Sequence, residues 1–294
     1  MNTRENGRFT VGGNQASISL PIGETFHTLI VKGNAAALMT LDKLVRGVLY
    51  LNDRIIMDFD PRKFLKIDKY KSGRAMGAEY LYIDFTEIDA KDPTSEFQGS
   101  IGTMPWSTMP QAMQDAYKDA VGVDVDSFKL VLYGLDETVP LGYLRSWRRV
   151  SKGTPLNNKI LTLLPYTYSL VTGAGKFEIL LPKGANSPHQ LKRSWLFERK
   201  VGGVDQKKIV GFEVWKNDRL VQQFIRDLNN EDQARYKGIP DDEMQVVDFC
   251  GFNYPAQEAL DTTDAVDLKI IIETSAATVI DYYNESYTNF AKAG

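Results

Sequence analysis

The chain has few of the residues on which catalysis, metal binding and disulfide formation depend. Its 294 residues include one cysteine, Cys250, and two histidines, His27 and His189. An intramolecular disulfide is therefore impossible, and Ser-His-Asp or Cys-His catalysis has almost nothing to draw on. The CxxC, HExxH and EF-hand patterns are also missing. We expect both histidines to be ordinary core or surface residues, and Cys250 to be a buried thiol made in a reducing compartment.

The sequence has neither an excess of positive charge nor a long apolar run. Lys and Arg total 35 against 38 Asp and Glu, which gives a net charge of −3. The bulk of the molecule is therefore not attracted to nucleic acid. Residues Met1–Arg8 are polar, and no window of about 18 uncharged apolar residues occurs. We expect no signal peptide, no transmembrane helix and no direct binding of nucleic acid.

What the sequence does have is the composition of a folded protein. It is 43% hydrophobic, 25% charged and 11% aromatic, which is far from the profile of a disordered chain. A chain of this length has room for two domains, each with a core of its own. Two domains are therefore the starting expectation.

Short segments of the first half recur in the second half. Ile18–Gly23 returns as Ile179–Gly184, and Asn52–Arg54 returns as Asn217–Arg219 with apolar residues on both sides of each copy. A repeat of this kind dictates architecture, because each copy is expected to form the same unit.

Further matches follow in the same order along the chain. Tyr82–Phe85 corresponds to Val246–Phe249, and Phe128–Leu132 corresponds to Leu268–Ile272. Several matches in one order, with gaps only where loops tolerate insertion, indicate duplication and divergence.

The residue pattern of each copy predicts β-strands. Alternating and continuous apolar runs with β-branched and aromatic residues favour half-buried or buried strands. One helix is expected over residues 61–71, after an Asp60-Pro61 start signal. We therefore predict an all-β fold of two tandem jelly-roll sandwiches with short helices in loops, divided into residues 1–152 and 153–294. The stretch Lys152–Asn158 supplies the break between them.

The repeated Asn-Asp pairs predict tight turns. Asn52 and Asp53, like Asn217 and Asp218, lie between two strand-like runs. Asn and Asp tolerate the positive φ that a two-residue hairpin requires. We interpret both pairs as hairpin corners rather than binding sites.

The first copy carries a loop insertion at about residues 88–125. It contains Met104, Trp106 and Met109 and a predicted helix over Gln111–Ala120. Insertions of this size lie at the end of a sandwich, where function is often found. A monomer would have little reason to expose these apolar residues, so Met104, Trp106 and Met109 are candidate interface residues.

Acidic residues offer two weaker hypotheses. Asp84 and Asp248 occupy equivalent places in the two copies, so we expect each to be structural rather than one of a catalytic pair. Clustered carboxylates can bind calcium, although solvated acidic loops are the simpler interpretation. The candidate calcium ligands are Asp124, Asp126, Asp241, Asp242 and Glu243.

Basic residues cluster with tryptophan at Arg145–Arg149 and at Lys192–Trp195. Such clusters can face lipid headgroups or nucleic acid. A solvated end of a sandwich, with the tryptophan in the domain interface, is the favoured interpretation.

These segments together resemble the double jelly-roll major capsid proteins of tailless icosahedral bacteriophages with an internal membrane, in particular the corticovirus-type coat protein. The resemblance extends from about Gly12 to about Tyr287 and is carried by Leu49–Ile56, Leu81–Phe85, Phe128–Leu132 and Asp267–Tyr283. It implies a structural protein with no catalytic residues, made in the host cytoplasm and located in the virion. Calcium is a possible cofactor by the same resemblance, without a matched ligand set.

The resemblance also implies homotrimeric, pseudo-hexagonal capsomers that bind neighbouring capsomers, with the viral inner membrane and a vertex protein as further partners. Geometry agrees, because three chains of two similar units present six similar units and can tile a surface. Two alternatives stay open: a tandem β-sandwich carbohydrate-binding protein and a β-sandwich hydrolase.

Overall fold

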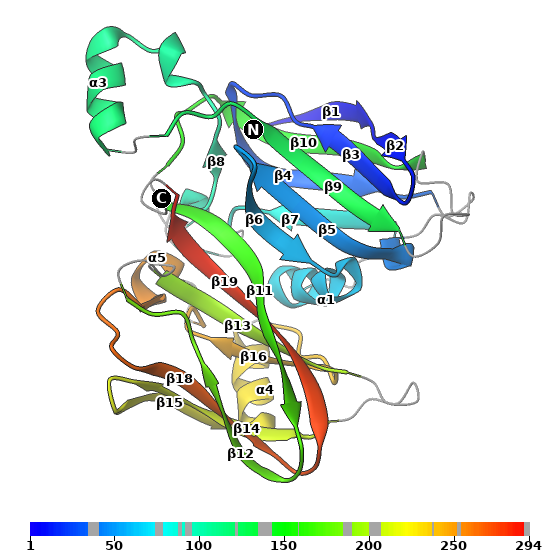
Figure 1. The fold of residues 1–294 in the computed structure, drawn as a ribbon, viewed down its shortest axis with the longest axis vertical. Coiled ribbons are helices and arrows are strands. Elements are labelled where there is room, and N and C mark those ends of the chain that lie inside the picture. The colour runs from blue at the N-terminus through cyan, green and yellow to red at the C-terminus, as the bar shows by residue number, and fades with distance from the viewer. Residues whose placement is uncertain are drawn as a thin grey trace. The chain divides into compact units, whose positions relative to one another are not determined.

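The structure is a computed structural model that describes residues 1–34, 41–73, 79–87, 90–91, 96–120, 123–134, 143–157, 159–184, 190–199, 207–236, 238–251 and 254–290. The chain folds into two compact units (Figure 1). The first unit comprises residues 1–69, 75–164 and 289–294, and the second comprises residues 70–74 and 165–288.

The first unit contains most of the strands that the first half of the sequence predicts. Its elements in chain order are β1 Asn2–Arg8, β2 Thr10–Gly12, β3 Gln15–Ser19, β4 Glu24–Lys32, η2 Leu41–Lys43, β5 Leu44–Leu51, β6 Arg54–Phe59, α1 Pro61–Ser72, β7 Tyr80–Asp84, β8 Ile101–Gly102, η3 Trp106–Thr108, α3 Gln111–Ala120, β9 Phe128–Gly134, β10 Arg145–Lys152 and the beginning of β11 Lys159–Val171.

Two sheets form the first unit. One has the strand order β1-β10-β4-β7, with β8 also paired to β4. The other has the order β6-β5-β9-β3-β2, and β11 runs parallel to the outer edge of β6. Phe26 of the first sheet and Phe128 of the second meet edge to face with ring centroids 4.9 Å apart, so the core lies between the two sheets.

The second unit contains the end of β11 and the remaining elements. These are β12 Gly175–Leu180, β13 Gln190–Glu198, β14 Ile209–Lys216, β15 Arg219–Ile225, α4 Arg226–Arg235, β16 Met244–Asp248, α5 Pro255–Glu258, β17 Leu260–Asp261, β18 Leu268–Thr274 and β19 Thr278–Asn289. The last turn of α1 also belongs to this unit.

The two units repeat one strand order. In the second unit β19-β13-β16 stands where the first has β10-β4-β7, and β12-β18-β14-β15 stands where the first has β3-β9-β5-β6. Even the short strands correspond, because β17 pairs with β13 as β8 pairs with β4. The duplication predicted from the sequence is therefore visible in the topology.

The repeated hairpins also share their register. In the first unit the β5–β6 ladder shifts between Leu49 and Tyr50, and in the second the β14–β15 ladder shifts between Val214 and Trp215. These bulges lie at equivalent positions, two residues before each Asn-Asp pair. A bulge at one place in both copies is an inherited feature of the fold rather than a local accident.

The core of the second unit draws on both of its sheets. Ile179, Phe212 and Ile270 come from one sheet, and Leu196 and Tyr282 come from the other, and all are buried in one cluster. The alternating burial along β18 explains this arrangement, because every second residue points into the core.

The helices lie where the sequence predicts them. Helix α1 spans Pro61–Ser72, and the Asp60 carboxylate accepts a hydrogen bond from the Arg62 backbone N–H, as an N-terminal cap does. Helix α3 spans Gln111–Ala120 within the insertion. Both helix predictions are confirmed.

The change of unit falls between Leu164 and Pro165, inside β11. The predicted division after residue 152 coincides with the end of β10 instead. Residues 153–157 carry no strand, in keeping with the Gly, Thr and Pro found there. One continuous strand leads from the first unit into the second, which an apolar run by itself does not reveal.

Candidate functional site

The repeated Asn-Asp pairs form the two hairpin corners. Asn52 and Asp53 join β5 to β6 with φ of 48° and 61°. Asn217 and Asp218 join β14 to β15 with φ of 50° and 60°. Both residues of each pair therefore occupy the left-handed region, which Asn and Asp enter at lower cost than most residues.

The asparagine side chains do more than tolerate this backbone. Asn52 Oδ1 accepts hydrogen bonds from the backbone N–H groups of Asp126 and Ser127, and its Nδ2 donates to the Asp124 carbonyl. The hairpin therefore holds the loop that leads into β9. Sequence analysis missed this role, although the repetition of the asparagine was its visible signal.

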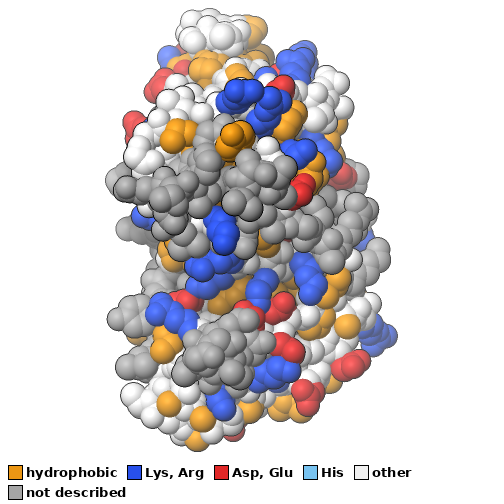
Figure 2. All heavy atoms as spheres, turned by 90° about the vertical axis from the view of Figure 1, so that its right-hand side faces the viewer, with side chains coloured by type: hydrophobic (Ala, Val, Ile, Leu, Met, Phe, Trp, Pro, Cys, Tyr) orange, Lys and Arg blue, Asp and Glu red, His pale blue; other side chains and the backbone are white. Residues whose placement is uncertain are grey.

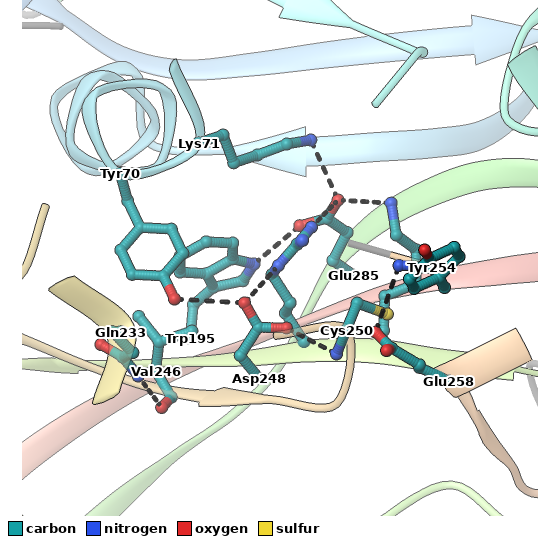
Figure 3. A network of polar contacts seen from close by, with 12 residues as sticks. Tyr70, Lys71, Trp195, Gln233, Val246, Asp248, Cys250, Tyr254, Glu258 and Glu285 are labelled. Atoms are coloured by element: carbon teal, nitrogen blue, oxygen red, sulfur yellow. Dashed lines mark hydrogen bonds and ion pairs between the residues drawn. The ribbon is translucent and has the colours of Figure 1, made fainter. Parts of the chain in front are cut away.

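Charged side chains gather inside the second unit (Figure 3). Lys192 and Arg193 of β13 and Glu285 of β19 are buried, and the Lys192 side chain has no exposed surface. Lys192 Nζ lies 3.2 Å from Glu285 Oε1, and Arg193 Nε lies 2.9 Å from Asp248 Oδ2 of β16. Two carboxylates therefore neutralise these cations away from water.

The last turn of α1 completes this buried charge cluster. Lys71 Nζ lies 3.1 Å from Glu285 Oε1, and the Tyr70 hydroxyl donates to Asp248 Oδ2 at 3.1 Å. Trp195 Nε1 donates to Glu285 Oε2 at 3.2 Å. Burial, followed by the nearby Asp248 carboxylate, raises the pKa of Tyr70 well above its ordinary value. The hydroxyl therefore stays protonated and acts as a hydrogen-bond donor.

This cluster corrects the prediction of a solvated basic end at Lys192–Trp195. The four residues are all buried, because β13 is the middle strand of its sheet and is covered on both faces. Their role is structural. Sequence reasoning also missed Glu285, whose only signal is a carboxylate in the Tyr-rich strand β19.

The other basic segment, Arg145–Arg149, forms most of β10 and alternates between two environments. Arg145 is exposed and Trp147 and Arg149 are half-buried, whereas Arg148 is buried. Arg148 Nε bonds Glu24 Oε2 at 2.6 Å. On the face drawn in Figure 2, Lys and Arg side chains lie beside acidic and hydrophobic ones.

The equivalent residues Asp84 and Asp248 each accept a hydrogen bond from the residue opposite on the neighbouring strand. Asp84 accepts a hydrogen bond from Thr28 Oγ1 at 2.6 Å, and Asp248 accepts from Arg193 at the equivalent place. The two lie in different units. Each has a structural role of its own.

Several of the candidate calcium ligands form contacts within the protein. Asp124 Oδ1 accepts from the Trp106 and Val125 N–H groups, and Asp242 forms an ion pair with Lys207. Asp126 contacts the Asn52 amide through its backbone N–H, and the Asp241 carboxylate caps the Glu243 N–H. Across the described residues, no three His, Cys, Asp or Glu side chains come together as a metal site.

The insertion folds back on itself. Met109 is buried, Met104 and Trp106 are half-buried, and the Trp106 ring meets the Tyr117 ring edge to face at 6.3 Å. Met113 of α3, which sequence analysis did not single out, is 57% exposed. The exposed apolar side chains of the insertion are therefore Phe97 and Met113, whereas Met109 lies in the interior.

His27 is a satisfied core histidine. Its ring nitrogens lie 3.0 Å from Ser100 Oγ and 2.8 Å from Ser151 Oγ, and burial lowers its pKa. His189 lies outside the described residues. Cys250 is buried, as expected. No helix among the described residues is long and apolar enough to cross a membrane.

Two units of one strand order, each with a core between two sheets, define the chain as a double jelly-roll protein. Residues 9–121 match the N-terminal domain of viral coat protein P2, and residues 160–290 match its C-terminal domain. The chain belongs to the viral coat protein P2 family. It is therefore a viral major capsid protein of the virion shell, a structural protein and not an enzyme.

Solved structures show the same fold. The major capsid protein P2 of bacteriophage PM2 is 15% identical with a TM-score of 0.74, and the match covers 99% of this chain and 100% of that one. A chain of Sulfolobus turreted icosahedral virus is 11% identical with a TM-score of 0.62, covering 99% and 91%. The Faustovirus major capsid protein is 6% identical with a TM-score of 0.59, covering 98% and 90%. A search of curated protein sequences finds no match.

Proposed function

We propose that the chain forms homotrimeric, pseudo-hexagonal capsomers that assemble into an icosahedral shell. The observation that carries this proposal is the strand order common to both units. Three copies of such a chain present six similar units around one axis, and a nearly hexagonal block can tile a surface. Neighbouring capsomers, an inner membrane and a vertex protein are the partners that this arrangement would meet.

The insertion of the first unit supplies a contact for a neighbouring copy in this proposal. Trp106 is half-buried and Met113 is exposed, so together they offer an apolar surface outside the core. An obligate contact between copies buries on the order of 2,000 Å² or more.

Light scattering of the purified protein at micromolar concentration tests the trimer directly. We expect the mass of three chains, and electron microscopy of concentrated samples should show sheets or shells. A stable single chain that neither associates nor assembles would contradict the proposal.

A further inference from the structure

Exposed apolar side chains gather on one face of the second unit. The sheet β12-β18-β14-β15 buries alternate residues in the core and turns the others outward. Among the outward-facing residues, Leu180 is 52% exposed, Leu220 46% and Ile225 64%, and Leu228 of α4 is 55% exposed. Surface hydrophobics are ordinary when single, but a group on one sheet calls for a partner.

The strand register makes several of these residues neighbours. Trp215 of β14 pairs with Leu220 on one side and with Lys269 on the other, and Lys269 pairs with Leu180. Further along the same strands, Gly211 pairs with Ile225. The apolar side chains therefore lie on the same surface from β12 to β15.

A pocket of about 310 Å³ opens on this face above Gly211. Phe212, Phe224, Ile225 and Leu228 are among the residues that line it. A side chain at position 211 is sterically opposed, because a Cβ there would lie 2.9 Å from the Phe224 carbonyl oxygen. The glycine thus leaves a hollow that is large enough for a side chain from outside.

The equivalent place in the first unit is filled. Arg46 occupies the position of Gly211, since both follow a register shift at the start of the strand. The Arg46 guanidinium donates to both carboxylate oxygens of Asp58, at 2.8 and 2.6 Å. At this place the first unit therefore has a charged pair, whereas the second unit has a glycine under an open pocket.

The sheet edge beside the pocket differs in the same way. In the first unit, β6 has β11 alongside it, through the pair Met57 and Leu163. Strand β15 occupies the place of β6 in the second unit, and the described residues provide no strand beyond it. Exposed strand edges with apolar side chains are normally covered, because their unpaired backbone groups recruit other chains.

We propose that this edge and outward face of the second unit form the contact for a second copy of the chain within the trimer, with an apolar side chain of that copy in the pocket above Gly211. The inference rests on the proposed trimer and locates one of its contacts. A shell protein meets other copies of itself, and the repeated fold places β15 where β6 already receives a strand.

The charges on this face fit a protein partner better than a phosphate-bearing one. Lys176 pairs with Glu213 at 2.5 Å, and Lys269 pairs with Glu178 at 3.5 Å. Glu273 adds another carboxylate to the pocket lining. With no excess of positive charge, the face has no attraction for a lipid phosphate or nucleic acid.

Alkylation of single introduced cysteines tests the contact. The variant Leu220→Cys places a thiol on β15, and Ile55→Cys places one at the equivalent position of β6, where Ile55 is 41% exposed. The native Cys250 is buried, so it contributes little background. Maleimide rates are measured on the trimer and normalised to the rates in denaturant.

We expect the Leu220→Cys thiol to react at least about ten-fold more slowly than the Ile55→Cys thiol in the trimer. If the protein has the mass of three chains but the two thiols react at equal rates, this contact is wrong and the proposed trimer still holds. A single-chain mass for the unmodified protein would overturn both. As a second measurement, Leu220→Asp should raise the concentration at which half of the chains form trimers about ten-fold or more, while thermal unfolding of the single chain stays unchanged. An unchanged concentration for trimer formation would contradict the inference.

Discussion

Asn52 and Asn217 make the same set of side-chain hydrogen bonds in the two units. Asn217 Oδ1 accepts from the backbone N–H groups of Val266 and Asp267, and its Nδ2 donates to the Asp264 carbonyl. Asn52 does the same with Asp124, Asp126 and Ser127. Each asparagine fastens its hairpin to the loop that leads into a central strand, which explains why the residue recurs in both copies.

The hairpin asparagines are therefore expected to stabilise their own units. Replacing Asn52 or Asn217 with Val removes these hydrogen bonds and forces a β-branched residue to a positive φ, at a cost of about 2–4 kcal/mol in the free energy of unfolding. Chemical denaturation with domain-specific probes measures the loss. Asp53→Gly and Asp218→Gly are the controls, since glycine accepts this φ and should leave stability nearly unchanged. Equal stability of the Val variants and the unmodified protein would contradict the assignment.

The buried charge cluster should be sensitive to the loss of one carboxylate. Glu285→Gln removes the carboxylate that Lys71, Lys192 and Arg193 share, so we expect a loss of about 3–5 kcal/mol in the free energy of unfolding. The double variant Glu285→Gln with Lys192→Met should recover part of it.

The matched control for this cluster is a surface ion pair. Asp242→Asn breaks the contact to Lys207, in which both side chains are more than half exposed, and should cost at most about 0.5 kcal/mol. Urea denaturation compares the three variants. A Glu285→Gln variant as stable as Asp242→Asn would show that the cluster is not electrostatically coupled.

Because His27 is buried, we expect the stability of the first unit to fall at acid pH. Burial lowers its pKa below the ordinary value of 6.5 in the folded chain, so the unfolded chain binds the proton more readily. The contribution of His27 to stability is then complete above pH 6.5 and is lost as the pH falls below it. We expect the thermal midpoint of the first unit to fall from pH 7 to pH 5, and the His27→Gln variant to show a smaller fall. An identical fall in the variant would rule out His27 as the sensor.

We expect substitutions in the insertion to impair assembly without impairing folding. Trp106→Glu places a charge on the half-buried ring position and should reduce trimer mass or shell formation more than thermal stability. Because Trp106 also packs on Tyr117, Met113→Asp is the cleaner variant: Met113 is exposed, so the fold should be unaffected. Sedimentation and electron microscopy measure assembly. Normal shells from Met113→Asp would remove α3 from the contact surfaces.

Local features of the fold were predictable because they depend on neighbours in the sequence. The alternation in Leu81–Phe85 and the apolar run Ile270–Ile272 predict strands, and Asp60-Pro61 predicts the start of α1. The repeated Asn-Asp-Arg and the other recurring segments indicate the duplication. The spacing of apolar side chains, the turn residues and the repeats can all be identified from the order of residues in the sequence.

The sites were decided by the tertiary structure. The burial of Lys192 and Arg193 depends on Asp248 and Glu285, which reach them across strand pairs from distant parts of the chain. The pocket above Gly211 lies where the first unit has Arg46, whose guanidinium donates to Asp58 of the neighbouring strand β6. The sequence by itself determined that two copies of one β-sandwich fold exist. Which charges are buried, and which sheet edge has no further strand among the described residues, follow from long-range strand pairing, because these properties belong to residues that are neighbours only in space.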